Sequence, residues 1–211
     1  SEEHGADGVL VVNPYYWKLS DEQLYRFFSC VAEHTKVQVF IYNIPQLTGQ
    51  NLSVELIKRL AEAHSNIVGI KETVSDFGHI RQVLTETKKV RSDFQVFSAF
   101  DEHFLPALMI GAAGSINGSA VFAPEIAVDL YETFQKGDLL AAQKNHQVIS
   151  KLMDIYTYCP TFFTAMKEAV HQRWFDVPAG HRAPNDVFSA ELRNNVATLL
   201  KKIELKEGVQ L

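Results

Sequence analysis

Five short apolar runs recur along the first half of the chain. They begin at Gly8 (GVLVV), Val37 (VQVFIY), Asn66 (NIVGIK), Phe94 (FQVFSA) and Gly114 (GSINGS), at intervals of 29, 29, 28 and 20 residues. Runs rich in Val, Ile and Phe with this spacing are typical of strands in a parallel sheet that helices cover. The pattern therefore predicts five parallel strands.

The segments between the runs carry helix signals. Residues 20–23 (SDEQ) form a capping box ahead of an apolar helical face. Ser53 and Asp76 precede similar faces, and Asp101 is expected to cap a further helix. Parallel strands need crossover connections of this kind, so the predicted architecture is α/β with a parallel sheet.

Beyond Ala120 the strand pattern ends and helices follow. They are expected to open at Pro124, to run from Leu139 to Tyr156, to follow Pro160 and to start at Ser189. A long loop is expected over residues 176–186 (DVPAGHRAPND). We expect a single structural domain, with strands and helices of a barrel in residues 1–122 and the last barrel helix and a helical extension in residues 123–211.

Composition narrows the classes of function. The 211 residues are 46% hydrophobic, with a net charge of -5 and a pI near 5.9, and their basic residues are dispersed, so nucleic acid is not an expected partner. No apolar run approaches the about 20 residues that cross a bilayer, so we expect no membrane contact and a cytoplasmic location. Cys30 and Cys159 belong to no metal or redox motif and are expected to be reduced core thiols.

The run at residues 66–73 (NIVGIKET) ends in Lys71, at the carboxyl end of a predicted strand. A lysine amine among apolar neighbours loses hydration that favours its charged form, and the neutral amine can attack a ketone to form a Schiff base. Tyr42 lies one strand-helix repeat earlier, so both side chains are expected at the same rim, where a phenol can transfer protons. The alternatives are a solvated strand-end lysine and a tyrosine that only caps its strand.

Other chemical motifs are weaker. Tyr15, Tyr16 and Trp17 favour packing or a subunit interface, and the small residues of 114–119 (GSINGS) favour a strand that leaves room for a substrate. We expect no metal and no cofactor, because the chain has no His/carboxylate cluster and no Gly-rich dinucleotide fingerprint. His34, His64 and His79 are interpreted as residues of helix ends or surfaces.

Three linked motifs together resemble a known family. Residues 13–16 (NPYY), 42–49 (YNIPQLTG) and 69–72 (GIKE) resemble the N-acetylneuraminate lyase and dihydrodipicolinate synthase family of class I aldolases in order and spacing. The resemblance covers essentially the whole chain, including the helical tail. It implies a TIM (β/α)8 barrel with a C-terminal helical extension.

The resemblance also implies roles for particular residues. Lys71 would form the Schiff base with pyruvate or another 2-oxo acid, and Tyr42 would relay protons. Tyr16 matches the tyrosine that the family lends to the active site of a neighbouring subunit, which implies a homo-oligomer, a dimer or a homotetramer. Ile116 matches the position whose backbone lines the pyruvate site, and Asn117 lies beside it.

Two departures from the family pattern bear on the reaction. The Gly-Thr-Thr-Gly-Glu type loop that holds the 2-oxo acid carboxylate does not occur in this sequence. Leu47 stands where the dihydrodipicolinate synthase branch has an arginine for the carboxylate of aspartate semialdehyde. The motifs are therefore more similar to those of 2-keto-3-deoxy-gluconate or -pentonate aldolases.

The expected function is a class I aldolase that cleaves a 2-keto-3-deoxy sugar acid to pyruvate and an aldehyde. A dihydrodipicolinate synthase or a 2-keto-3-deoxy acid dehydratase with the same Schiff base is one alternative, and a truncated, non-catalytic fragment is another. Five strands do not close a barrel of eight, so three strand-helix units are expected in front of Ser1, for a total of roughly 295 residues. The structural alternative is an open, doubly wound five-stranded sheet.

Overall fold

The computed structural model of the chain describes residues 5–175, 179–180, 182–184 and 188–203. The chain divides into two compact units, residues 1–116 and 117–211. The described strands all lie in the first unit, which carries the residues of the predicted chemistry from Tyr16 to Ile116.

The predicted runs form one parallel sheet. Its strands are β1 (Gly8–Val12), β2 (Gln38–Asn43), β3 (Ile67–Glu72), β4 (Gln95–Ser98) and β5 (Gly114–Ser115). They are hydrogen-bonded in the order β1-β2-β3-β4-β5, and each neighbouring pair is parallel. A doubly wound sheet reverses its strand order at a switch point, so this sequential order rules out the doubly wound alternative.

Helices of the first unit begin at the expected caps. Ser20 forms the capping box of α1, and the side chains of Ser53 and Asp76 cap α3 and α4. The prediction for Asp101 is wrong, because Asp101 lies within a 3₁₀ turn and makes no cap for α5. The elements are α1 (Asp21–Glu33), α2 (Pro45–Thr48), α3 (Val54–Ala63), α4 (Phe77–Val90), the 3₁₀ turn Asp101–His103 and α5 (Phe104–Met109).

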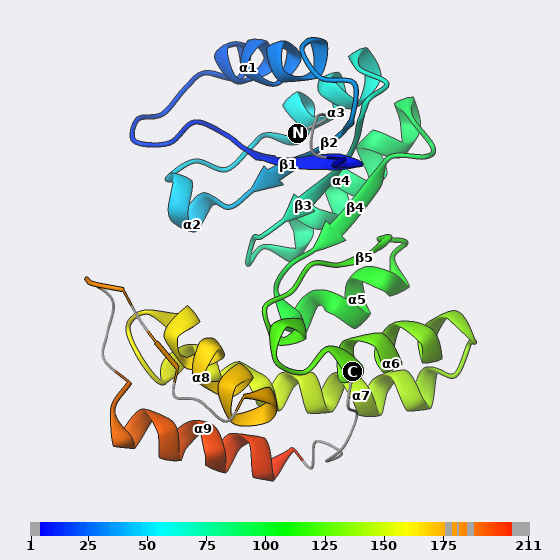
Figure 1. Cartoon of the computed structure of the whole chain (residues 1–211). Coiled ribbons are helices and arrows are strands. Elements are labelled where there is room, and N and C mark those ends of the chain that lie inside the picture. The colour runs from blue at the N-terminus through cyan, green and yellow to red at the C-terminus, as the bar shows by residue number, and fades with distance from the viewer. Residues whose placement is uncertain (1–4, 176–178, 181, 185–187, 204–211) are drawn as a thin grey trace. The chain divides into compact units, whose positions relative to one another are not determined.

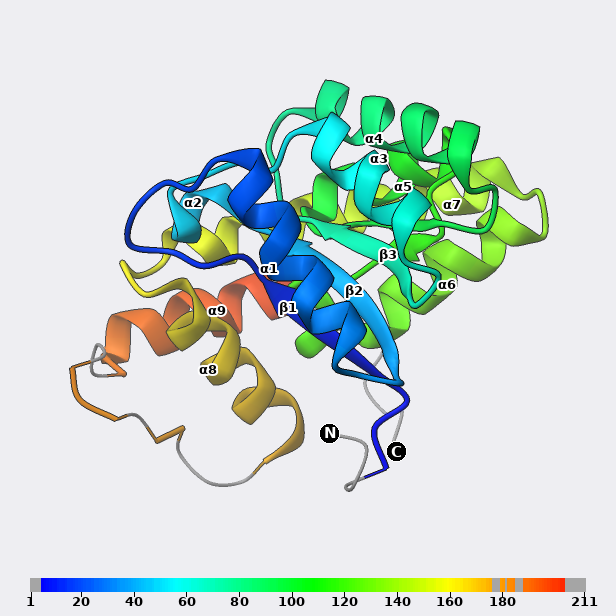
Figure 2. The same ribbon diagram turned by 90° about the horizontal axis from the view of Figure 1, so that it is seen from above.

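The two faces of the sheet differ in burial. Ile41, Ile70 and Val96 are register partners, and all three are buried in the core of the first unit. Helices α1, α3 and α4 lie along this side of the sheet (Figures 1 and 2). Because side chains alternate along a strand, the next residue of each strand points to the opposite face. That face carries the candidate chemistry.

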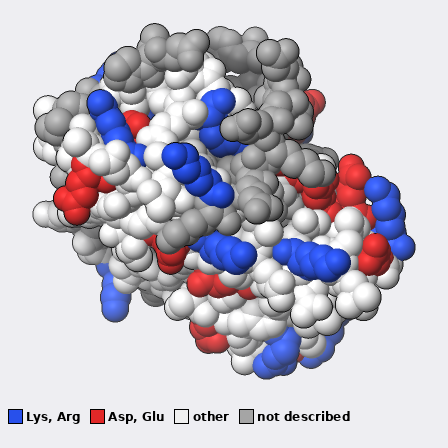
Figure 3. Space-filling view, turned by 90° about the horizontal axis from the view of Figure 1, so that it is seen from below, with Lys and Arg blue, Asp and Glu red and all other residues white. Residues whose placement is uncertain are grey.

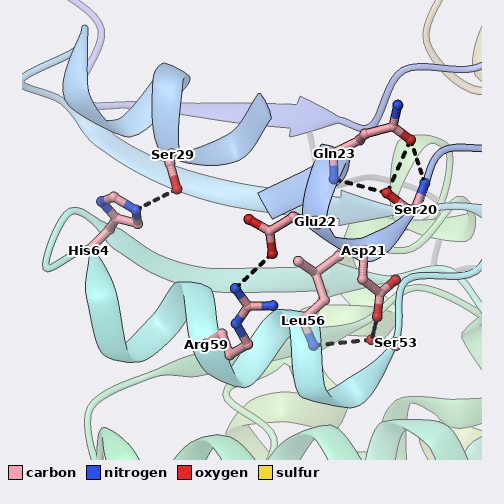
Figure 4. A network of polar contacts seen from close by, with 9 residues as sticks. All are labelled: Ser20, Asp21, Glu22, Gln23, Ser29, Ser53, Leu56, Arg59 and His64. Atoms are coloured by element: carbon pink, nitrogen blue, oxygen red, sulfur yellow. Dashed lines mark hydrogen bonds and ion pairs between the residues drawn. The ribbon is translucent and has the colours of Figure 1, made fainter. Parts of the chain in front are cut away.

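Polar contacts join α1 to α3, as Figure 4 shows. The Ser53 hydroxyl accepts a hydrogen bond from the Leu56 N–H and donates one to Asp21, so both helix starts share one network. Arg59 pairs with Glu22 at 3.1 Å. These contacts fix the two helices against each other on the covered face of the sheet.

Gly69 permits close packing two residues before Lys71. A Cβ at this position would lie 2.4 Å from the carbonyl oxygen of Gln95 and 2.9 Å from the ring of Phe40. The Phe40 ring itself packs edge-on against Phe97, with centroids 5.9 Å apart. A side chain at residue 69 would therefore displace either β4 or the aromatic pair beside the candidate site.

The second unit is helical where the structure describes it. Its core surrounds the buried ring of Phe122, and Arg173 pairs with Glu125 at 2.8 Å and donates to the Phe122 carbonyl. The predicted loop at residues 176–186 lies largely outside the described residues. The helices are α6 (Pro124–Gln135), α7 (Leu139–Leu152), α8 (Phe162–Trp174) and α9 (Ala190–Lys202), and the helix expected to reach Tyr156 continues beyond Leu152 as the 3₁₀ turn Met153–Thr157.

Three kinds of feature bear on the expectations from the sequence: surface charge, membrane-spanning helices and clusters of metal ligands. On the face drawn in Figure 3, basic and acidic side chains lie interspersed. In the part of the chain that the structure describes, no helix has the length and apolarity to cross a membrane, and no three His, Cys, Asp or Glu residues gather as metal ligands.

The prediction of core thiols is wrong for Cys30, which is exposed on α1. Cys159 is half-buried, and neither cysteine forms a disulfide.

Candidate active site

The carboxyl ends of β2, β3 and β4 bring three side chains into one row. Tyr42 is the register partner of Lys71, and Lys71 is the partner of Phe97. All three are partly exposed and lie on the sheet face opposite the helices. The expected juxtaposition of Tyr42 and Lys71 is therefore present in the structure.

The lysine and the tyrosine contact each other directly. Lys71 Nζ donates a hydrogen bond to Tyr42 Oη at 3.3 Å and lies 4.3 Å from the centroid of the Tyr42 ring. An amine and a phenol at this separation can exchange protons with one bound substrate. The geometry suits Schiff-base chemistry, and the catalytic roles of the two residues stay predictions.

An open hollow of about 330 Å³ lies beside Tyr42. Leu47 projects at its rim with 69% of its surface exposed. Among the residues that the structure describes, the lining side chains are mostly apolar and include no arginine or lysine: Leu10, Val12, Tyr15, Tyr42, Ile44, Leu47 and Thr48. The described lining of the hollow is thus uncharged on the Leu47 side of Tyr42.

The aromatic loop after β1 is exposed and strained. Tyr16 is 91% exposed, and its φ of 94° is unusual for a bulky L-residue. Its ring meets that of Trp17 edge-on at 5.7 Å, and Tyr15 and Trp17 are also exposed. Strain and exposed aromatic area together support a role in contacts outside this chain.

Ile116 and Asn117 lie on the two sides of the boundary between the units. The Ile116 N–H donates to the Ser98 carbonyl at 2.9 Å, which places Ile116 at the carboxyl end of the sheet. Asn117 belongs to the second unit, where its Nδ2 donates to Ser119 Oγ at 3.2 Å. The structure therefore brings Ile116 to the carboxyl end of the sheet, and Asn117 is described within the helical unit.

Sequence reasoning missed a buried polar group behind the lysine. Glu72 is fully buried and accepts a hydrogen bond from Asn43 at 2.9 Å. His79 was expected at a helix end or on the surface, but it is 8% exposed, and its Nε2 lies 3.5 Å from Glu72 Oε1. Burial lowers the pKa of His79, but the Glu72 carboxylate at 3.5 Å, with the charge of Asp76, outweighs it and raises the pKa overall. Among the described residues, neither Glu72 Oε1 nor His79 Nε2 has a hydrogen-bond partner, so this contact is an ion pair. A signal was available, since an acidic residue in a buried β-strand calls for a polar partner.

The chain is similar in sequence to one protein family and in fold to several solved structures. Residues 1–203 match the dihydrodipicolinate synthetase family. Among solved structures, the prophage protein YagE of Escherichia coli K12, described in complex with pyruvate, superposes with a TM-score of 0.93 at 34% identity, and the match covers 97% of this chain and 68% of that chain. Dihydrodipicolinate synthase of Thermotoga maritima superposes with a TM-score of 0.89 at 31% identity, over 97% and 68% of the two chains. The predicted (β/α)8-barrel class is confirmed, and the described residues of this chain form five strands.

The chain belongs to the dihydrodipicolinate synthetase family. The putative 2-dehydro-3-deoxy-D-gluconate aldolase YagE of E. coli K12 is 34% identical over 97% of this chain and 68% of its own length. The probable 2-dehydro-3-deoxy-D-pentonate aldolase YjhH of the same organism is 36% identical, over 95% of this chain and 66% of its own. A DapA-like lyase of Thermococcus onnurineus is 38% identical, over 96% and 69%. The predicted class of enzyme, a lyase, is confirmed, and the chain spans about two thirds of the length of these relatives.

Proposed function

We propose that the protein is a class I aldolase that cleaves a 2-keto-3-deoxy sugar acid to pyruvate and an aldehyde. The observation that carries the proposal is the 3.3 Å contact between Lys71 Nζ and Tyr42 Oη at the carboxyl ends of adjacent parallel strands. In (β/α)8 barrels this end of the strands is where catalytic residues lie. A primary amine and a phenol together provide the nucleophile and the proton relay that the reaction needs.

The proposed steps use these two side chains. The amine of Lys71 attacks the C2 ketone, and the Tyr42 hydroxyl gives its proton to the departing oxygen, so loss of water leaves a protonated Schiff base and a Tyr42 phenolate. The phenolate takes the proton of the C4 hydroxyl, the C3–C4 bond breaks, and its electron pair forms an enamine as the aldehyde leaves. Tyr42 returns this proton to C3, and water then adds to the Schiff base, gives one proton back to the Tyr42 phenolate, and releases pyruvate and the free amine. The cycle consumes and regenerates one water and needs no cofactor.

The apolar hollow supports the sugar-acid branch. Leu47 offers no bidentate grip on a carboxylate, which an arginine at this position would provide. The hollow that Leu47 shares with Leu10 and Ile44 has an uncharged lining. Two of the named relatives carry 2-dehydro-3-deoxy sugar acid aldolase names. A hydroxylated aldehyde is therefore the proposed leaving group, and aspartate semialdehyde is a poor acceptor.

We also propose that the Tyr15–Trp17 loop joins subunits of a homo-oligomer and that Tyr16 completes the site of the adjacent chain. Its 91% exposure and positive φ support this assignment. Tyr16→Phe should lower turnover, and Trp17→Ala should shift the assembly in sedimentation velocity. A fully active monomer would remove this role from Tyr16.

A substrate comparison tests the proposed function. Pyruvate release is measured with 2-keto-3-deoxygluconate and 2-keto-3-deoxypentonate, and condensation of pyruvate is measured with aspartate semialdehyde and with glyceraldehyde. The measurements use residues 1–211. We expect kcat/KM to favour the sugar acids and glyceraldehyde.

The alternatives give different results in the same assays. A dihydrodipicolinate synthase would prefer aspartate semialdehyde, and a dehydratase would release water from the sugar acid without producing an aldehyde. A fragment without a complete site would turn over none of them as residues 1–211. Replacing Leu47 by Arg is expected to shift selectivity toward the semialdehyde, with Gln46→Arg as the matched control on the same turn of α2.

A further inference from the structure

A buried polar row lies directly behind the lysine and the tyrosine. Asn43 is the register partner of Glu72, and Glu72 is the partner of Ser98. These residues follow Tyr42, Lys71 and Phe97 by one position on their strands, and all three are fully buried. A polar row at this depth is costly unless its groups bind one another.

Glu72 joins three elements. Its Oε2 accepts a hydrogen bond from Asn43 Nδ2 on β2 at 2.9 Å, and its Oε1 lies 3.5 Å from His79 Nε2 on α4. Asn43 in turn donates to Asn51 Oδ1 at 2.7 Å and accepts from the Leu52 N–H at 3.2 Å. The carboxylate thus connects β3 to its neighbouring strand and to the helix that follows it.

The alternation of side chains transmits this constraint to the opposite face. Fixing Asn43 against Glu72 behind the sheet also fixes Tyr42 against Lys71 in front of it. A slip of β3 by one residue would place Glu72 in front and bury the lysine amine. The polar contacts behind the sheet therefore disfavour that slip.

We propose that Glu72, held by Asn43 and His79, is a positioning residue that keeps Lys71 Nζ within hydrogen-bonding distance of Tyr42 Oη. The inference rests on the proposed function for its kinetic consequence. The geometric claim stands on the contacts alone. A buried ion pair is weak support for stability by itself, since well-packed apolar residues often replace one without loss. The carboxylate can fix the register of β3 against β2 through its hydrogen bond to Asn43, and a leucine cannot.

Two variants separate positioning from stability. Glu72→Gln keeps an oxygen that accepts from Asn43, whereas the double variant Glu72→Leu with His79→Phe fills the same space and removes the polar contacts. Thr87→Val is the control, because Thr87 is also fully buried on α4 and its hydroxyl bonds only within the helix, to the Val83 carbonyl. If the double variant does not fold, Asn43→Ala removes the same contact from the β2 side.

The measurements are kcat and KM for sugar-acid cleavage and the Nζ to Oη distance in crystal structures of the variants. We expect the double variant to lose about 10- to 100-fold in kcat with KM nearly unchanged, because small displacements of reacting groups have effects of this size. Its Nζ to Oη distance should exceed hydrogen-bonding range. Glu72→Gln and Thr87→Val should keep both the rate and the distance.

Each result decides the inference. An unchanged distance in the double variant overturns it, whether or not kcat falls. A displaced lysine with an undiminished kcat supports the positioning by Glu72 and overturns its kinetic consequence. If the unmodified protein cleaves no sugar acid, the proposed function fails, but the distances in the variants still decide whether Glu72 positions the lysine.

Discussion

The two ends of β3 hold polar side chains in opposite ways. At the amino end, the Arg91 guanidinium donates to three backbone carbonyls, those of His64 at 3.0 Å, Ser65 at 2.7 Å and Ile67 at 2.8 Å. It also pairs with Asp93 at 3.0 Å. This side chain therefore satisfies the backbone of the loop that leads into the strand.

At the carboxyl end, the side chains of Lys71 and Glu72 contact other side chains rather than the backbone. Lys71 meets Tyr42, and Glu72 meets Asn43. In the described part of the chain, Thr73 Oγ1 is buried there with no hydrogen-bond partner. Side chains that are held in place but keep unused hydrogen-bonding capacity can bind a substrate. A guanidinium that already donates to three carbonyls has little capacity left. The comparison leads us to propose that one end of the strand contributes stability and the other contributes chemistry, the division typical of (β/α)8 barrels.

The largest expected effect tests the chemical end. Lys71→Ala removes the proposed nucleophile, so kcat/KM for sugar-acid cleavage should fall by more than about 10³-fold. The side chain is partly exposed and makes one hydrogen bond, so the free energy of unfolding should change by less than about 1 kcal/mol. Steady-state kinetics and urea unfolding measure the two quantities. A variant that unfolds readily would contradict the division of roles.

Tyr42→Phe removes only the phenolic oxygen. Because general acid-base catalysis contributes about 10²-fold or more, kcat should fall by at least about 10²-fold while KM for the sugar acid changes little. The ring that lies against Lys71 Nζ is retained, so folding should be unaffected. Phe97→Leu serves as the control, because Phe97 is the register partner of Lys71 on the other side, on β4. An equal loss of kcat there would show that packing, not the hydroxyl, sets the rate.

At the other end, Arg91→Ala should lower the free energy of unfolding by about 2 kcal/mol or more, because three carbonyls lose a charged donor. Arg91→Lys should recover little, since one ammonium cannot reproduce the planar fork. The rate per folded molecule should stay the same. Lys89→Ala, in the last turn of α4 just before Arg91, removes an exposed pair with Glu86 and is expected to cost less than about 1 kcal/mol. A large loss of kcat in Arg91→Ala would break the comparison.

The smallest effect concerns pH. Because folding raises the pKa of His79, the protonated ring favours the folded state. That contribution is fully present below the unfolded pKa of about 6.5 and is lost as pH rises through the higher folded value. Burial lowers the pKa of His103, which gives the opposite trend. The difference in unfolding free energy between the protein and His79→Gln should therefore shrink from pH 5.5 to 8, and a difference independent of pH would contradict the pairing with Glu72.

Local patterns were enough to predict the sheet and most helix starts. The strand at residues 8–12 coincides with β1, and Ser20 and Ser53 cap their helices as expected. The Tyr42 and Lys71 juxtaposition was predictable because a 29-residue repeat preserves register at the strand ends. The residue roles that come from the family resemblance stay predictions.

Properties that depend on distant contacts were not predictable. His79 lies in the first turn of α4, where sequence alone does not distinguish the sheet-facing side from the solvent side. Its burial depends on Glu72, whose own burial depends on register with Asn43. Cys30 was assigned to the core because it belongs to no metal or redox motif. Its exposure depends instead on which side of α1 packs against the sheet.

Reductive trapping of pyruvate tests the central claim most directly. The protein is incubated with pyruvate and sodium borohydride, and the adduct is located by peptide mass mapping, with Lys71→Ala as the control. We predict a single reduced adduct on Lys71 that is absent from the control. An adduct on another lysine, or one that persists in Lys71→Ala, would contradict the account.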